Sequence, residues 1–176
     1  MALLQISEPG KSTMPHEHRR VIGIDLGTTN SLVASVVNGS PTILNLNSKS
    51  NLLPSIVHYS NESIRIGNDA KNLLSKDPKN TISSSKRLIG KTITDINQDH
   101  FSLNLADGEG VINIKTSIGM KNPIEVSAEI LKTLKSVAEN NLGGELMGAV
   151  VTVPAYFDEA QRQATKDACG LAELKV

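Results

Sequence analysis

Two apolar segments on either side of a short polar turn limit the possible folds of this chain more than any other feature. The segments VIGIDL (21–26) and SLVASVV (31–37) are rich in β-branched residues, and only the turn GTTN (27–30) separates them. Such segments joined by a Gly- and Asn-containing turn predict an antiparallel β-hairpin. The density of apolar residues predicts that the first strand is buried on both faces. A third strand is expected at 42–46.

Asp25 is the one charged residue in the first apolar segment. A buried carboxylate costs on the order of several kcal/mol unless something compensates it, so Asp25 either caps the turn or faces a ligand or metal. Gly27 allows close backbone approach, and the amides of Thr28, Thr29 and Asn30 are candidates to line an anion site. Asp25 would then hold Mg²⁺ through water. No Gly-Lys-Ser/Thr follows, so the segment is not a Walker loop.

The last third of the chain has clear helical signals. Asn122, Pro123 and Glu125 match a capping box with a first-turn proline, and apolar residues recur at helical spacing as far as the stop signal at 143–144. An apolar strand is expected at 149–153, ended by Pro154. A second capping box at Asp158 predicts a helix that runs to about residue 172, and a last strand is expected at 174–176.

The middle of the chain, from about 49 to 119, alternates short apolar pieces with polar turns and predicts a mixed insertion. Strands are expected at 55–59 and 63–67, and short helices at 69–75 and 83–89. The whole order predicts an α/β chain, with a mixed sheet and flanking helices, whose core is 21–48 and 120–176. Because a sheet that ends on a three-residue strand has an unprotected edge, we expect this lobe to be truncated at Val176.

Composition excludes several functional classes. The 176 residues contain 18 basic and 18 acidic side chains, no Trp, two Phe and two Tyr. Such a chain has no field to attract nucleic acid and few rings on which bases would stack, so we predict no nucleic-acid partner. The order of the first twenty residues is not that expected of a secretory signal, and no apolar run nears the roughly 20 residues of a membrane span.

The expected location is therefore cytoplasmic, with no membrane partner and with residues 1–20 as a flexible arm. Cys169 is the only cysteine, which fits a reducing compartment and predicts a small buried helix residue rather than a reactive thiol. His16 and His18 are either polar residues of the arm or weak metal ligands.

Seven segments in order carry a family resemblance. They are VIGIDLGTTNS (21–31), LPS (53–55), Gly67, KRLIG (86–90), VSAEIL (126–131), VPAYF (153–157) and QRQATKDA (161–168). Together they resemble the DnaK-like heat-shock chaperone ATPases, a branch of the actin and sugar-kinase superfamily with a ribonuclease-H-like fold. The first residues, MALLQISEPG, are similar to the arm of the branch that serves iron–sulfur cluster assembly.

The resemblance implies an ATP hydrolase whose cofactors are ATP and Mg²⁺, with K⁺ as a further candidate. In the family, the turn at Gly27, Thr28, Thr29 and Asn30 cradles the phosphates and the position of Asp25 helps to hold magnesium. Lys86 matches the catalytic lysine that reaches the γ-phosphate and the attacking water. Without the resemblance, Lys86 is interpreted as a solvated helix lysine. The implied reaction is phosphoryl transfer to water.

Other family roles fall on the segment after the fourth core strand. Pro154 and Arg162 match a pair that couples nucleotide state to the substrate domain, and Tyr156, Asp158 and Glu159 match the surface for J-domain co-chaperones. Their alternative roles are a strand terminator for Pro154, an N-cap for Asp158 and a solvated helix residue for Arg162. The implied partners are an HscB-like J-domain protein and, for the full-length relative, an IscU-like iron–sulfur scaffold as client.

Some family features are missing or changed. The second phosphate loop, the catalytic-site glutamate, the adenosine-gripping lobe and the peptide-binding domain are all expected beyond Val176, so we expect the chain alone to be catalytically incompetent. Gly170 stands where relatives carry a helix former, and Glu173 where they carry a helix-ending glycine, which predicts a weak helix end.

Two other functions are considered. One is a non-catalytic fragment that acts only through the co-chaperone surface or other contacts of the lobe. The other, an actin-like filament subunit or sugar kinase, is disfavoured by the segments DLGTTNS and VPAYF.

We predict that the isolated 176-residue chain binds ATP weakly or not at all. One hairpin and one lysine supply only half of a cleft that, in the family, encloses the nucleotide between two lobes. The expected dissociation constant is about millimolar, which corresponds to roughly −4 kcal/mol. Calorimetric titration checks this, and low-micromolar binding by a monomeric chain would contradict it.

Overall fold

The computed structural model describes residues 20–47 and 50–176. The flexible arm expected at 1–20, together with His16 and His18, therefore lies outside the described residues except for Arg20. The Arg20 guanidinium donates from Nε to the Leu142 carbonyl (3.0 Å) and ties the start of the described chain to the end of a long helix.

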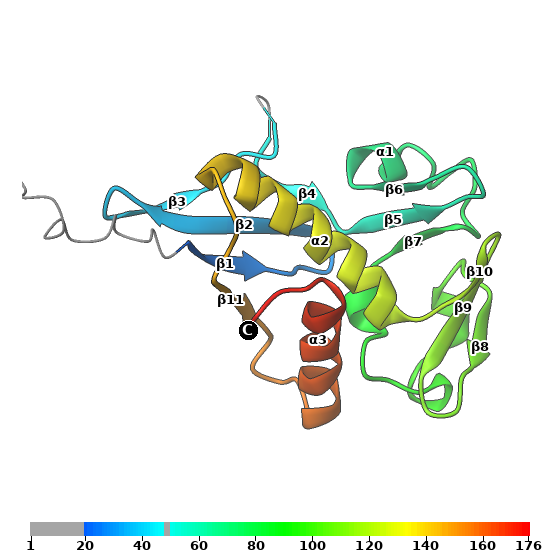
Figure 1. The fold of residues 1–176 in the computed structure, drawn as a ribbon. Helices are drawn as coiled ribbons and strands as arrows, with labels where there is room; N and C mark the ends of the chain where they lie inside the picture. The colour runs from blue at the N-terminus through cyan, green and yellow to red at the C-terminus, as the bar shows by residue number, and fades with distance from the viewer. Residues whose placement is uncertain (1–19, 48–49) are drawn as a thin grey trace, which may run out of the picture.

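A mixed sheet forms the centre of the structure (Figure 1). Its strands lie in the order β11 (Gly148–Thr152), β1 (Val21–Asp25), β2 (Asn30–Val37) and β3 (Ser40–Ile43), and β4 (Leu53–Pro54) also pairs with β2. The predicted hairpin is confirmed, since β1 and β2 are antiparallel. β11 pairs in parallel with β1 along its whole length. The third strand begins two residues earlier than expected, because it follows directly on the turn at 38–39.

The prediction that β1 is buried on both faces is wrong. Ile22 and Ile24 are buried, whereas Val21 is 48% exposed, Val36 on β2 is 67% exposed and Val150 on β11 is 65% exposed. The reason is that the long helix α2 packs across one face of the sheet (Figure 1), and no described helix covers the other. The sheet therefore alternates buried and exposed residues.

Helix α2 (Pro123–Leu142) is the longest element, and its ends are as predicted. The Asn122 side chain accepts from the Glu125 amide and the Glu125 carboxylate accepts from the Asn122 amide, which forms a capping box. Gly143 ends the helix in the left-handed region at φ 70°. The buried stripe of the helix is Val126, Ile130, Leu131, Leu134 and Ala138, all 0% exposed.

Helix α3 (Glu159–Leu171) follows β11 and begins with the second predicted capping box, between Asp158 and Gln161. Cys169 is 1% exposed on this helix, as expected, and its burial raises the pKa of the thiol to about 11. Glu173 adopts φ 53°, a backbone conformation that costs a non-glycine residue on the order of 1 kcal/mol or more.

The strand expected at 174–176 is not formed. Leu174 turns into the core at 6% exposure, and the one backbone contact with β11 is the bond from the Ala149 amide to the Lys175 carbonyl (2.7 Å).

The segment between the two parts of the core forms two small antiparallel sheets. The first contains β5 (Ile56–Tyr59), β6 (Ile64–Ile66) and β7 (Thr81–Ser83), and the second contains β8 (Leu105–Asp107), β9 (Ile112–Thr116) and β10 (Gly119–Lys121). The two expected helices are each one turn long: α1 (Asn68–Lys71) and a 3₁₀ turn at Ser85–Arg87. Two further 3₁₀ turns lie at Ile93–Asp95 and Gln98–His100.

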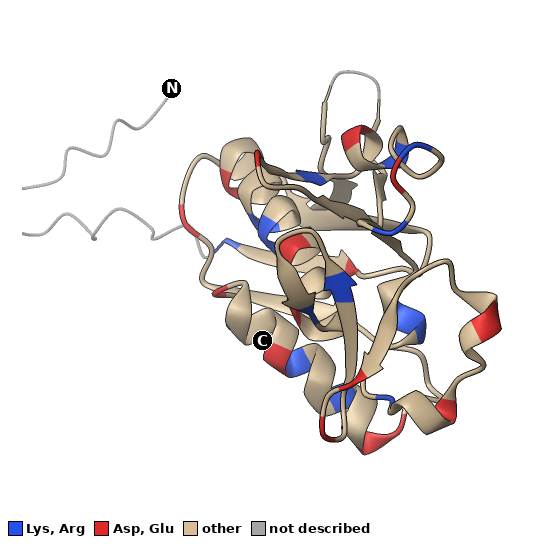
Figure 2. Ribbon diagram, turned by 90° about the vertical axis from the view of Figure 1, so that its right-hand side faces the viewer, with Lys and Arg blue, Asp and Glu red and all other residues tan. Residues whose placement is uncertain are grey.

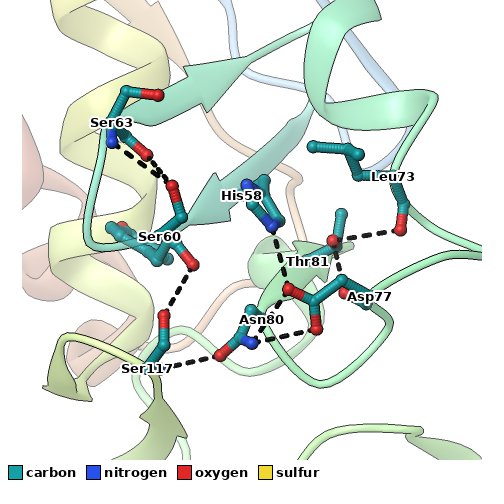
Figure 3. A network of polar contacts seen from close by, with 9 residues as sticks. His58, Ser60, Ser63, Leu73, Asp77, Asn80, Thr81 and Ser117 are labelled. Atoms are coloured by element: carbon teal, nitrogen blue, oxygen red, sulfur yellow. Dashed lines mark hydrogen bonds and ion pairs between the residues drawn. The ribbon is translucent and has the colours of Figure 1, made fainter.

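A polar network joins the two small sheets (Figure 3). His58, which is 6% exposed on β5, donates from Nε2 to the Asp77 carboxylate (3.1 Å), and Asn80 donates to both oxygens of the same group (2.9 Å each). The Asn80 side-chain oxygen accepts from the Ser117 amide (2.7 Å) between β9 and β10. Asp77 is therefore the acceptor on which this network converges.

Charged residues of both signs are interspersed on the side of the molecule that Figure 2 shows. In residues 20–47 and 50–176, no helix combines the length and apolar character that crossing a membrane requires.

We predict that Asp77→Ala lowers the free energy of unfolding by about 1–3 kcal/mol, because buried His58 loses its acceptor. The hydrogen bonds from Asn80 and then His58 hold the pKa of Asp77 below its usual range. Its contribution is therefore present above the unfolded-state pKa of about 4 and is lost as the pH falls through the lower folded-state pKa.

Denaturant unfolding at neutral and acidic pH measures this contribution. The difference between the parent and Asp77→Ala should shrink as the medium becomes acidic. Asp107→Ala is the matched control, because Asp107 is exposed on β8. Equal stability of the two variants at neutral pH would contradict the role given to the network.

Candidate functional site

The turn between β1 and β2 has room only for a glycine at position 27. A Cβ atom at Gly27 would collide with the Asn30 backbone carbonyl, so the close approach that Gly27 permits is within the turn itself. The Gly27 amide donates to Ser31 Oγ (3.1 Å), which in turn contacts Ser55 Oγ at 2.9 Å. Ser31 therefore links the turn to Ser55.

The next two amides of the turn are unpaired. Among the described residues, neither the Thr28 amide nor the Thr29 amide has a hydrogen-bond partner, and Thr29 and Asn30 are exposed. The Thr29 carbonyl accepts from the Ser55 amide (2.8 Å), which holds the turn in place. Adjacent free amides beside hydroxyls are the donor set that an anion such as a phosphate group requires.

Asp25 lies at the end of β1 and is exposed to solvent. Its Oδ1 accepts from the Thr152 hydroxyl (2.9 Å) on the neighbouring strand β11. Among residues 20–47 and 50–176, Asp25 accepts no hydrogen bond from the turn, where Ser31 Oγ accepts from the Gly27 amide instead. The turn-cap interpretation of Asp25 is therefore wrong, and its other oxygen is available to an ion or ligand.

Lys86 reaches from the 3₁₀ turn at 85–87 to the hairpin. Its Nζ donates to the Leu26 carbonyl (2.6 Å) and lies 5.6 Å from the centre of the Phe157 ring. Partial burial lowers the pKa of the Lys86 ammonium, and the nearby Asp25 carboxylate opposes this shift. The structure contradicts the interpretation of Lys86 as a solvated helix lysine.

The loop from β11 to α3 folds back on itself around Phe157. The Phe157 amide donates to the Pro154 carbonyl (3.1 Å), and Arg162 Nε donates to the Phe157 carbonyl (3.1 Å). Arg162 also donates to the Ala155 carbonyl (3.4 Å). Arg162 is therefore not a solvated residue, because it closes the loop that Pro154 opens.

The three predicted co-chaperone residues lie together at the start of α3. Tyr156 is 84% exposed and contacts Phe157 edge to face, with ring centres 5.7 Å apart. Asp158 caps α3 by accepting from the Gln161 amide (2.8 Å), so its structural role is confirmed. Glu159 is exposed in the first helical turn.

A pocket of about 310 Å³ lies between the hairpin turn, the 3₁₀ turn and the loop before α3, and neither Asp25 nor Arg162 is among the residues that line it. Its walls include Thr28 from the hairpin, Lys86 from the 3₁₀ turn, and Tyr156 and Phe157 from the loop before α3. A second cavity of about 400 Å³ lies between β11 and α3 beside Arg162, but it contains no residue of the 27–30 turn. The first pocket is therefore the candidate site.

These residues fit a magnesium–nucleotide ligand. The free amides and hydroxyls of the turn and the Lys86 ammonium suit phosphate oxygens, and Asp25 is one carboxylate suited to bind a hydrated Mg²⁺ ion. In the described residues no group of three or more His, Cys, Asp or Glu could enclose a metal. Binding of magnesium through its waters is consistent with this donor set.

Sequence reasoning missed Ser31, Thr152 and Phe157. Ser31 is the first hydroxyl after the turn, a position from which it can cap a preceding amide, so a local signal existed. Thr152 and Phe157 had none, because their contacts with Asp25 and Lys86 join residues far apart in the sequence.

Comparison with known proteins supports the resemblance. The family model for Hsp70 proteins matches residues 21–176. The chaperone protein HscA homolog of Methylobacillus flagellatus is 56% identical over 178 residues, which cover 100% of this chain and 29% of that protein. The HscA homologs of Histophilus somni and Neisseria meningitidis are 55% and 56% identical. Each of these alignments also covers 100% of this chain and 29% of the relative.

The chain thus spans 29% of the length of the curated relatives that it matches. The expected α/β fold of an actin-like ATPase lobe is confirmed by the family match together with the mixed sheet and its helices. The family match over 21–176 and the identity to HscA homologs along the whole chain show that this chain belongs to the Hsp70 family.

Proposed function

We propose that this chain forms part of the nucleotide-binding lobe of an ATP-dependent chaperone that acts in the maturation of iron–sulfur proteins. The observation that carries the proposal is the 2.6 Å hydrogen bond from the Lys86 ammonium to the Leu26 carbonyl, directly before the turn that contains the free amides of Thr28 and Thr29. The relatives named as chaperone protein HscA homologs support the chaperone role. The resemblance of the first residues, MALLQISEPG, to the branch that serves iron–sulfur cluster assembly supports the client class.

In this proposal bound Mg-ATP supplies the phosphoryl group that passes to water. The Thr28 and Thr29 amides and their hydroxyls bind phosphate oxygens. Asp25 orients hydrated magnesium, while the Thr152 hydroxyl fixes the carboxylate rotamer. Lys86 holds a positive charge where negative charge develops, and a preorganised charge in a partly desolvated site is worth more than one in water. Partial burial of Lys86 is consistent with this role.

The loop before α3 would connect this site to partners. Pro154 and Arg162 belong to one hydrogen-bonded loop that also carries Phe157 under the Lys86 ammonium. A change in that loop therefore reaches Lys86 directly, which supports a coupling role. The exposed surface of Tyr156, Asp158 and Glu159 is proposed to bind a J-domain co-chaperone, with an iron–sulfur scaffold as the client. A cytoplasmic location is part of the proposal.

We predict different effects of two substitutions on a chimera. In it, residues 21–176 replace the matching segment of the M. flagellatus HscA homolog. Lys86→Ala should lower single-turnover ATP hydrolysis by about 100- to 1000-fold and leave nucleotide affinity nearly intact, because Lys86 acts on developing charge. Asp25→Asn should instead weaken magnesium-dependent binding. Single-turnover kinetics and calorimetry measure both quantities.

Lys115→Ala is the matched control, since Lys115 is an exposed lysine of β9 away from the pocket. Equal losses of affinity and rate in both site variants would show that the roles are assigned wrongly. A chimera without ATP hydrolysis, beside an active parent, would refute the proposed function of the lobe.

A further prediction concerns the charge pair alone. Asp25→Asn should lower the pKa of Lys86 further, because the one nearby charge that opposes desolvation is removed. Titration of the Lys86 ¹³Cε resonance on the 176-residue chain measures the change, with Asp107→Asn as the matched control. An unchanged Lys86 pKa would mean that the two side chains do not share a site.

A further inference from the structure

Two segments far apart in sequence make a backbone-to-backbone contact beside the candidate site. Gly90 has φ +68°, and a Cβ atom built there would lie 2.6 Å from Gln161 Cα, 2.7 Å from Gln161 N and 3.0 Å from the Ala160 carbonyl carbon. All three atoms belong to the backbone of the first turn of α3. No side chain at this contact can move aside to make room for a larger residue.

The α3 side of the contact is fixed. Gln161 is 7% exposed, its amide donates to the Asp158 carboxylate (2.8 Å) and its side chain accepts from the Asp158 amide (3.2 Å). Ala164, one turn later, packs with Ile89 and Phe157 in a small buried cluster. This first turn therefore acts as a rigid surface for the segment that contacts it.

On the Gly90 side, the contact is made by residues 85–91, a hydrogen-bonded segment that includes Lys86. The Leu88 and Ile89 amides both donate to the Ser85 carbonyl (2.9 and 3.1 Å), and the Lys91 amide donates to the Leu88 carbonyl (3.2 Å). Successive bonds of this kind join residues 85–91 into one unit. Gly90 and Lys86, one turn earlier, therefore belong to the same hydrogen-bonded segment.

The contact distance at Gly90 and the length of the Lys86 hydrogen bond show how small a displacement would break that bond. Relieving the contact from 2.6 Å to the ordinary 3.4 Å needs a shift of about 0.8 Å. The bond from Lys86 to the Leu26 carbonyl is 2.6 Å long, and a lengthening of that order takes it beyond the roughly 3.2 Å limit of a good N–H···O bond. Only a residue without a Cβ atom at position 90 avoids this displacement.

We infer that Gly90 is a positioning residue for Lys86. Because Gly90 has no side chain, the 85–91 segment packs directly on the first turn of α3, and this contact places the Lys86 ammonium against the Leu26 carbonyl and the Phe157 ring. The part of this inference that concerns the position of Lys86 rests on these contacts alone. The consequence for ATP hydrolysis rests on the proposed function of the site.

Nuclear Overhauser contacts test the position on the 176-residue chain without nucleotide. The contact between the Lys86 ε-methylene and the Phe157 ring should be present in the parent and lost in Gly90→Ala. Gly39→Ala is the matched control, since Gly39 has a similar φ of +78° but no atom within 4 Å of its Cβ position. This control should keep the contact, and a contact that persists in Gly90→Ala overturns the inference.

A second substitution separates steric collision from backbone strain. Asn tolerates positive φ better than most residues but still has a Cβ atom, so Gly90→Asn should lose the Lys86–Phe157 contact as Gly90→Ala does. A contact restored by Asn would show that strain is the cause and would overturn the inference. If both Gly90 variants fail to fold, Ile89→Val loosens the same packing by one methyl group. That variant should weaken the contact, and full retention counts against the inference.

Kinetics of the chimera described above give the functional test. Gly90→Ala should lower kcat by about 10- to 100-fold, because a displacement near 1 Å misplaces a catalytic group, while KM changes by less than about twofold. Equal changes in kcat and KM would indicate general damage and overturn the positioning role. A lost Overhauser contact with unchanged kcat would leave the position of Lys86 established and refute its proposed catalytic function instead.

Discussion

Helix α2 packs its apolar stripe against the central sheet, the first small sheet and helix α3 at the same time. Val126, Ile130, Leu131 and Leu134 are all 0% exposed. Each such burial is worth roughly 1.5–3 kcal/mol, so the four together are comparable to the ~5–15 kcal/mol stability of a whole domain. The core and the insertion therefore share one hydrophobic interior, and the insertion is not an independent unit.

This shared interior explains how the candidate site is held. Ser85, at the start of the 3₁₀ turn, is 3% exposed and contacts Ser127 of α2, with the two hydroxyl oxygens 3.5 Å apart. Ser127 also donates to the Pro123 carbonyl (2.7 Å) in the first turn of α2. The helix thus supports the segment that presents Lys86, while the opposite side of that segment rests on α3. The segment that presents Lys86 is therefore held between two helices.

Most of the core was predictable from local signals, and much of the site was not. The starts of α2 and α3 followed from capping boxes, because the side chains that cap a helix lie within three residues of the amides they bind. The hairpin followed from its turn. The one-turn lengths of α1 and the 85–87 element did not follow from their apolar spacing, because packing against neighbouring sheets decides where such short helices end.

The site residues divide in the same way. The residues of the 27–30 turn were singled out by their own chemistry as well as by the resemblance, whereas Lys86 was identified by the resemblance alone, since composition and spacing favoured a solvated lysine. The partial burial of Lys86 depends on Leu26, 60 residues earlier, and on Phe157, far later in the chain. The exposure of one face of β1 also depends on which elements cover the sheet, which an apolar count does not reveal.

The parallel pairing of β1 with β11 has a consequence for the order in which the protein forms during synthesis. Asp25 and Thr152, which share a hydrogen bond, are 127 residues apart in the chain. At a synthesis rate of about 5–20 residues per second, β1 waits roughly 6–25 s before its neighbour is made. During that interval the hairpin has one edge without a partner strand, and such an edge can pair with other chains. The nascent hairpin is therefore exposed to association with other chains until β11 has been synthesised and has paired with β1.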